Sequence, residues 1–253
     1  MTRFGPSDDL SGAAFVDVGL RGARFTRCDL SRAVLRAVDV DGAEVDAPWL
    51  SSLWVNGVDV APFVEGELDR RFPGRGERGA TSPDGLRRAW TKVEHAWAAA
   101  VERVAAMPPG TADVSVAGEW SFAQTLRHLV MATDTWFRVA VQGVEKPYHP
   151  LGVPNAEYAT DGYDTSIFAA TEPPYAEVLE VRAGRVAMVR DFLAAVTSDD
   201  LVVPRRHPWA AEYEVTTLEC LHTILTEEWE HLRYATRDLD AIAAAGTPGG
   251  PMA

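Results

Sequence analysis

Hydrophobic side chains recur at steps of three and four residues in four segments of the C-terminal two thirds of the chain. These segments span about 82–107, 121–137, 175–196 and 217–240. Such spacing places the hydrophobic side chains on one face of an α-helix, and that face is normally buried against other helices. The sequence therefore predicts a four-helix bundle over residues 80–245. The Gly- and Pro-rich residues 246–253 are expected to form a disordered tail.

A different period governs the N-terminal part, where bulky hydrophobic residues recur every five positions: Leu10, Phe15, Leu20, Phe25, Leu30, Leu35, Val40, Val45 and Leu50. The residues two positions earlier are mostly small. Neither the period of a helix nor that of a strand fits this pattern, which indicates a repeat module. Asn56-Gly57 predicts a tight turn, and residues 60–71 predict a short helix that closes the module at about residue 75. Pro73 and the glycines after it place the domain boundary near 75–81.

The repeats AAFVD, ARFTR, CDLSR and AVLRA resemble those of the pentapeptide-repeat family. This resemblance implies a short right-handed quadrilateral β-helix of little more than two coils, with the bulky and small residues pointing inward. The expected fold class is α+β, a β-helix followed by a four-helix bundle. Some members of that family mimic DNA, but residues 1–60 carry nine acidic residues against six arginines. We therefore favour a packing or capping module.

The net charge of −13 argues against a nucleic-acid partner, because binding to phosphates requires positive charge. No hydrophobic run reaches membrane-spanning length, and the N-terminus lacks the hydrophobic segment of a signal peptide. These features predict a cytoplasmic protein without a membrane partner. The two cysteines, Cys28 and Cys220, are far apart, which excludes a disulfide scaffold or a cysteine-rich zinc module.

Glu227 and His231 lie one turn apart in the last predicted helix, which is the spacing by which one helix offers two ligands to one metal ion. Glu228 falls in the middle of the hydrophobic face, where a carboxylate requires a compensating cation. The periodicity does not decide which glutamate is the ligand. In the second helix, His128 lies close to the buried face. Taken alone it is typical of a core residue, but the pair in the last helix favours a role as a ligand.

The motifs TLRHLV and EEWEH, in helices joined by a long crossover, resemble the DinB/YfiT-like superfamily of helical-bundle metalloenzymes. In that family a histidine of the second helix and an HxxxH pair of the fourth hold a divalent metal. Here Glu227 replaces the first histidine of the pair. The mycothiol-dependent maleylpyruvate isomerase branch is similar, with a His, Glu, His set at these places. The resemblance thus implies His128, Glu227 and His231 as metal ligands.

Three protein ligands leave a coordination position open on a zinc-like ion, as in catalytic sites. Zinc is the expected metal, although nickel, iron and cobalt also accept nitrogen and oxygen ligands. The sequence is interpreted as that of a metal-dependent S-transferase or isomerase that activates a low-molecular-weight thiol of the mycothiol type toward an electrophilic substrate. Glu228 is the candidate catalytic carboxylate, which would act as a base or orient a metal ligand without binding the metal itself. A homodimer is compatible with this interpretation.

Other residues are candidates for substrate contacts. Trp136 and Trp229 are predicted to form the wall of the pocket. The connection over residues 143–174 is long, and long connections in compact domains often bind ligands; its candidates at a substrate entrance are Tyr148, His149 and Tyr158. Two alternative functions stay open: a hydrolase in which water replaces the thiol, and a non-catalytic, metal-stabilised scaffold for interactions or stress responses.

Overall fold

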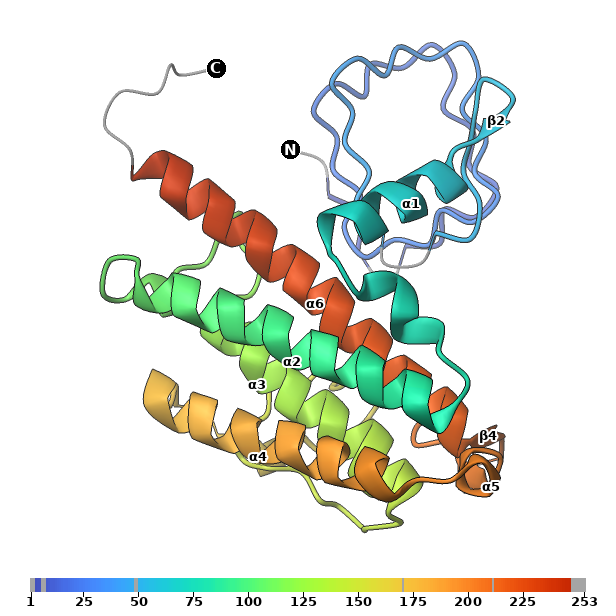
Figure 1. Cartoon of the computed structure of the whole chain (residues 1–253). Helices are drawn as coiled ribbons and strands as arrows, with labels where there is room; N and C mark the ends of the chain where they lie inside the picture. Colours follow the sequence, from blue (N-terminus) through green and yellow to red (C-terminus); the bar gives the residue numbers. More distant parts are fainter. Residues whose placement is uncertain (1–2, 6–7, 48–49, 170, 211, 247–253) are drawn as a thin grey trace. The chain divides into compact units, whose positions relative to one another are not determined.

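The computed structural model describes residues 3–5, 8–47, 50–169, 171–210 and 212–246 (Figure 1). The chain divides into two compact units, Met1–Asp46 and Ala47–Ala253. The predicted disordered tail lies outside the described residues from position 247 onward. No helix within the described ranges combines the length and the hydrophobicity that crossing a membrane would require.

The second unit contains the predicted helical bundle. Its helices are α2 (Pro83–Ala105), α3 (Phe122–Thr133), which continues as the π-helix η3 (Asp134–Val141), α4 (Tyr175–Ala195) and α6 (Thr217–Ala245). Helix α2 packs against α4 and α6, and α3 packs against the same two helices, so each helix has two neighbours (Figure 1). Their hydrophobic faces meet in one core that includes Trp90, Leu126, Phe137, Val189 and Trp229. The predicted four-helix bundle is therefore confirmed.

Side-chain caps fix where these helices begin. Ser82 accepts a hydrogen bond from the backbone N–H of Gly85 at the start of α2. At the start of α3, Ser121 and Gln124 form a capping box, in which each side chain accepts from the backbone N–H of the other. Thr216 and Glu219 do the same for α6. A cap satisfies backbone donors that have no partner within the helix, so the first residue of each helix is well defined.

A hairpin and a short helix precede the bundle. Strands β1 (Trp54–Val55) and β2 (Val58–Asp59) pair antiparallel around Asn56 and Gly57, whose φ angles of 50° and 83° suit a type I′ turn. Helix α1 (Ala61–Arg71) and the 3₁₀ helix η1 (Arg75–Gly79) follow. The predicted turn and short helix are thus confirmed.

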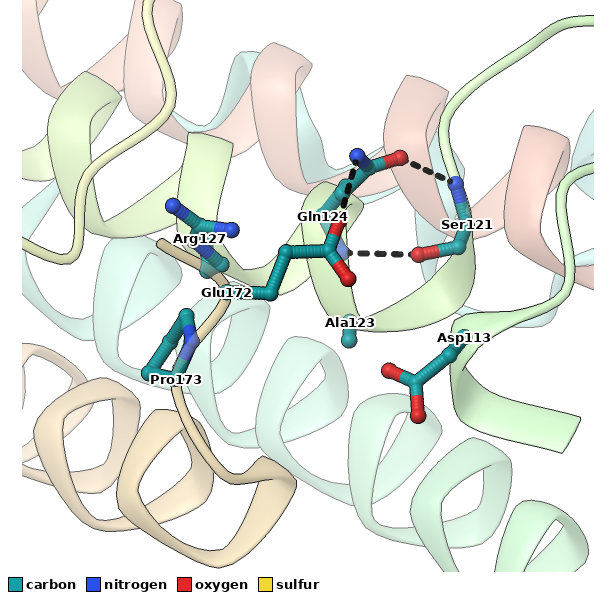
Figure 2. Close-up of a pocket in the computed structure, with 7 residues that line it drawn as sticks. All are labelled: Asp113, Ser121, Ala123, Gln124, Arg127, Glu172 and Pro173. Atoms are coloured by element: carbon teal, nitrogen blue, oxygen red, sulfur yellow. Dashed lines mark hydrogen bonds between the residues drawn. The ribbon is translucent and has the colours of Figure 1, made fainter. Parts of the chain in front are cut away.

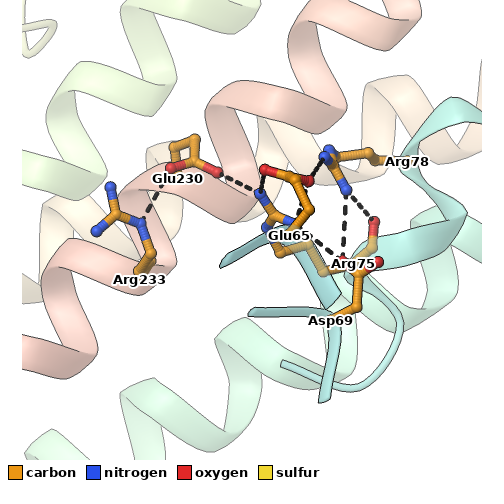
Figure 3. A network of polar contacts seen from close by, with 6 residues as sticks. All are labelled: Glu65, Asp69, Arg75, Arg78, Glu230 and Arg233. Atoms are coloured by element: carbon orange, nitrogen blue, oxygen red, sulfur yellow. Dashed lines mark hydrogen bonds and ion pairs between the residues drawn. The ribbon is translucent and has the colours of Figure 1, made fainter. Parts of the chain in front are cut away.

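The domain boundary expected near residues 75–81 falls inside the second unit. Residues 75–81 belong to this unit because Arg75 links them to it. Its guanidinium is buried and donates hydrogen bonds to Glu65 and Asp69 of α1 and to Glu230 of α6 (Figure 3). A buried guanidinium requires several carboxylate partners, so this segment is held to the bundle instead of acting as a linker.

Short elements complete the second unit: η2 (Thr111–Asp113), η4 (Thr165–Ile167), α5 (Ser198–Leu201), and the antiparallel strands β3 (Pro204–Arg206) and β4 (Glu214–Thr216). In its described residues, the long connection between η3 and α4 contains no regular element other than η4. It is tied to the bundle by Asp134, a fully buried carboxylate that accepts hydrogen bonds from Arg185 Nε at 2.7 Å and from the backbone N–H of His149 at 2.9 Å.

The first unit repeats along its backbone without forming a sheet. Turns recur every ten residues, and the backbone N–H groups of Ala13, Ala23, Ala33 and Ala43 each donate to the carbonyl oxygen three residues earlier. No described residue before position 47 belongs to a strand, and the bulky residues are exposed, for example Phe15 at 53% and Phe25 at 58%. The predicted β-helix with an inward-facing core is therefore not found. A repeat buries its hydrophobic side chains only against neighbouring coils, and a unit this short supplies few of them.

Replacing Asp134 by alanine is predicted to lower the free energy of unfolding by about 3 kcal/mol or more, because it leaves the largely buried Arg185 guanidinium without its carboxylate. Urea denaturation followed by circular dichroism measures this loss. The matched control is Glu67→Ala, which removes the exposed ion pairs of Glu67 with Arg70 and Arg71 in α1 and should cost less than about 1 kcal/mol. Equal losses in the two variants would contradict the anchoring role of Asp134.

Candidate metal centre

Three side chains with metal-ligating atoms converge where α3 packs against α6. His128 comes from α3, and Glu227 and His231 come from α6. The Oε2 atom of Glu227 is 3.5 Å from Nε2 of His128 and 3.1 Å from Nε2 of His231. One ligand atom from each residue lies within 4.8 Å of the other two. The predicted convergence of His128 with the pair of the last helix is therefore confirmed.

A backbone carbonyl fixes the tautomer of His128. Its Nδ1 atom is 2.9 Å from the carbonyl oxygen of Val153, which can only accept a hydrogen bond. Nδ1 therefore carries a proton, and Nε2, which faces Glu227, is the nitrogen that can bind a metal. Metal-ligating histidines are commonly oriented in this way. Sequence reasoning missed this contact, because the acceptor is main chain in an irregular loop.

Arg127, the neighbour of His128, holds that loop in place. Its Nε donates to the carbonyl oxygen of Leu151 at 2.8 Å, and its own carbonyl oxygen accepts from the backbone N–H of Val153 at 3.3 Å. The loop that orients the ligand is thus tied to the residue preceding the ligand. This arrangement limits how far the Val153 carbonyl can move away from the imidazole.

The surroundings of the ligands favour the protonation states that bind metal. Burial by itself would raise the pKa of Glu227, but the contacts of its carboxylate with the imidazoles of His128 and His231 outweigh it and hold this pKa well below its usual value. Burial lowers the pKa of His231. At neutral pH the carboxylate is therefore ionised and His231 is neutral, the forms in which both coordinate a cation. Two imidazole nitrogens and one carboxylate oxygen suit a zinc-like divalent ion, so the donor set fits the metal that the sequence predicts.

Glu228 does not belong to this cluster. It is 1% exposed, and both of its carboxylate oxygens lie 2.5 Å from Nη2 of Arg182 in α4. Burial raises the pKa of Glu228, and the guanidinium opposes that shift. The predicted need for a cation is met by Arg182, which the sequence did not identify. The structure places Glu228 in a buried ion pair with Arg182, and its catalytic role stays a prediction. Glu227 is the glutamate beside the histidines.

An unpredicted tryptophan borders the cluster. The ring centroid of Trp120 is 4.6 Å from that of His128 and 5.9 Å from that of His231. The predicted wall residues lie elsewhere: Trp229 is 1% exposed in the bundle core, and Trp136 packs edge-on against His207. In the sequence, the feature that could have indicated Trp120 is its position directly before the cap of α3, where hydrophobic residues often pack against the helix.

The three loop candidates occupy the connection between η3 and α4. His149 is half-buried, and its backbone is held by Asp134. Tyr148 is half-buried and packs edge-on against Phe168. Tyr158 is buried and also packs against Phe168. The roles of Tyr148 and His149 in substrate binding stay predictions.

Two cavities of the bundle are lined by residues other than the ligands. Figure 2 shows one of about 10 Å³, room for a single water molecule, at the start of α3; it is lined by Asp113, Ser121, Ala123, Gln124, Arg127, Glu172 and Pro173. Another, of about 200 Å³, lies between α2 and α4 and is lined by Arg87, Trp90, Thr91, Arg190, Leu193 and Ala194. The cluster itself reaches solvent at Glu227 and His231, whose side chains are 27% and 16% exposed.

A double-mutant cycle tests the assignment of Glu228. Arg182→Met should lower the free energy of unfolding by about 3–5 kcal/mol, because the Glu228 carboxylate is left buried and unpaired. Adding Glu228→Leu should recover part of that loss, since no uncompensated charge then remains. Chemical denaturation of the two single variants and the double variant gives the coupling energy. Losses that simply add would show that the two side chains do not act as a pair.

Comparison with known proteins agrees with the site. Residues 92–235 match the family model of the DinB superfamily, a range that runs from α2 to α6 and includes His128, Glu227 and His231. The repeats of the first unit lie outside this match. No curated protein and no solved structure matches the chain. Because the family match covers more than half of the sequence and carries the three clustered residues, the protein belongs to the DinB superfamily.

Proposed function

We propose that this protein binds a divalent metal ion, zinc in the first place, through His128, Glu227 and His231, and that it acts as a thiol transferase or thiol-assisted isomerase. The thiol is a low-molecular-weight one of the mycothiol type, and the second substrate is an electrophile. The observation that carries this proposal is the convergence of two imidazole nitrogens and one carboxylate oxygen within 4.8 Å.

Several features of the site support a metal that takes part in chemistry. Three protein ligands leave a position open, which distinguishes catalytic zinc sites from closed structural ones. The partial exposure of Glu227 and His231 gives a small molecule a way to that position. A divalent ion there would lower the pKa of a thiol that reaches it, so that the thiol becomes a nucleophile at neutral pH.

The chain's own residues have separate tasks in this proposal. His128 presents Nε2 because Val153 accepts from its Nδ1–H. Glu227 supplies the negative charge, which reduces the net charge of the loaded site to about +1 for a divalent ion. Trp120 limits water on the side where it covers the imidazoles. A sulfur nucleophile would therefore meet its electrophile next to a flat hydrophobic surface.

Metal binding is tested first. Purified without an affinity tag and titrated with zinc, the protein should bind one equivalent and melt at a higher temperature, because the ion binds the folded state. His231→Ala and Glu227→Ala should each weaken binding by more than about 100-fold, beyond the loss expected for a residue that only supports a ligand. His95→Ala, on the exposed face of α2, is the matched control and should bind like the wild type. Tight zinc binding by His231→Ala would refute this ligand set.

The reaction class is tested next with two substrate panels. Zinc-loaded protein should consume an electrophile only when a low-molecular-weight thiol is present, and His231→Ala should abolish this turnover. A panel of esters and amides without thiol tests the hydrolase, which the solvent-exposed edge of the cluster also permits. Hydrolysis without thiol would replace the proposed reaction. Metal-dependent melting without any turnover would favour the non-catalytic scaffold.

A further inference from the structure

The indole ring of Trp120 contacts both imidazoles of the candidate metal centre. It is inclined by 33° to the ring of His128 and by 33° to that of His231, and the two imidazole centroids are 4.7 Å apart. Trp120 is half-buried and directly precedes Ser121, the cap of α3. One side chain thus packs against the two ligands that come from different helices.

The backbone on both sides of Trp120 is well held. Before it, the Ser115 hydroxyl donates to the carbonyl oxygen of Glu119 at 2.6 Å, and the backbone N–H of Glu119 donates to the carbonyl oxygen of Val116 at 2.9 Å. After it comes the capping box of α3. Because a tight turn and a capped helix flank Trp120, its ring has a defined place beside the imidazoles.

The two imidazoles differ in their other support. His128 has the hydrogen bond to the carbonyl oxygen of Val153. In the part of the chain that the structure describes, His231 makes no hydrogen bond through Nδ1. Its neighbours besides Glu227 and His128 are the rings of Trp120 and Tyr234, the latter at a centroid distance of 6.2 Å. Trp120 is therefore the ring that can hold His231 relative to His128.

We propose that Trp120 is a positioning residue of the metal centre, whose ring keeps the imidazoles of His128 and His231 at the separation that a shared ion requires. This inference rests on the proposed metal site. Packing of this kind reduces the conformational entropy that the two imidazoles lose when the ion binds. Removing the Trp120 ring should therefore lower the affinity for metal, as the removal of other groups that orient metal ligands does.

Zinc affinity of three variants, measured by competition with a chromophoric chelator, tests the proposal. Trp120→Ala should bind zinc about 10–100-fold more weakly than the wild type. Trp120→Phe keeps a flat ring and should recover most of the affinity. Trp209→Ala is the matched control, since Trp209 is also half-buried and packs in an aromatic group, with Tyr158 and Tyr163. It should bind zinc like the wild type.

Two further readouts separate positioning from general stability. Melting of the metal-free proteins should show similar losses for Trp120→Ala and Trp209→Ala, while only the former loses affinity. Zinc should change the tryptophan fluorescence of the wild type and of Trp209→Ala but not that of Trp120→Phe.

Unchanged zinc affinity in Trp120→Ala, or an equal loss in Trp209→Ala, would overturn the inference and leave the metal site standing. A wild-type protein that binds no zinc would overturn the site itself and the inference with it.

Discussion

Glu227 and Glu228, two consecutive glutamates of α6, each need a positively charged or hydrogen-bonding partner inside the bundle. Adjacent helical residues project about 100° apart, so Glu227 and Glu228 face different neighbours. Glu228 meets Arg182 of α4, whose guanidinium is always charged, and the two opposite charges compensate each other. Glu227 meets two imidazoles, which are neutral in the form that binds metal. The negative charge of Glu227 is therefore free to attract a cation. This difference makes Glu227 the candidate ligand, while its neighbour Glu228 forms an ion pair.

The candidate site depends on segments that are far apart in the sequence. The capping box at Ser121 fixes the start of α3 and with it the height of His128 in the bundle. The irregular connection after η3 returns to that helix and supplies the carbonyl of Val153, and Asp134 and Arg127 hold this connection. Asp134 also begins the π-helix η3, a type of segment that is often found at functional sites. The ligands are thus positioned by packing and hydrogen bonds outside their own helices.

Periodicity predicted the four helices, because each buries one face, and the spacing of Glu227 and His231 predicted that they share a side. Periodicity could not identify Arg182, since the partner of a buried acid is set by packing between helices, here between residues 46 positions apart in the sequence. For the same reason it assigned Trp229 to a pocket wall, although that ring fills the core, and it missed Trp120, which lies outside any regular element. In the first unit the five-residue period is local information. It predicted a repeating backbone, but not that turns would recur every ten residues or that the bulky side chains would stay exposed.

The central claim is that His128, Glu227 and His231 share one divalent ion. X-ray absorption at the metal edge, on protein purified without an affinity tag and loaded with one equivalent of zinc, tests it most directly. The account predicts a first shell of nitrogen and oxygen atoms at about 2.0–2.1 Å, with the outer-shell scattering of two imidazole rings. A bound metal without imidazole scattering, or protein that retains no stoichiometric metal, would contradict it.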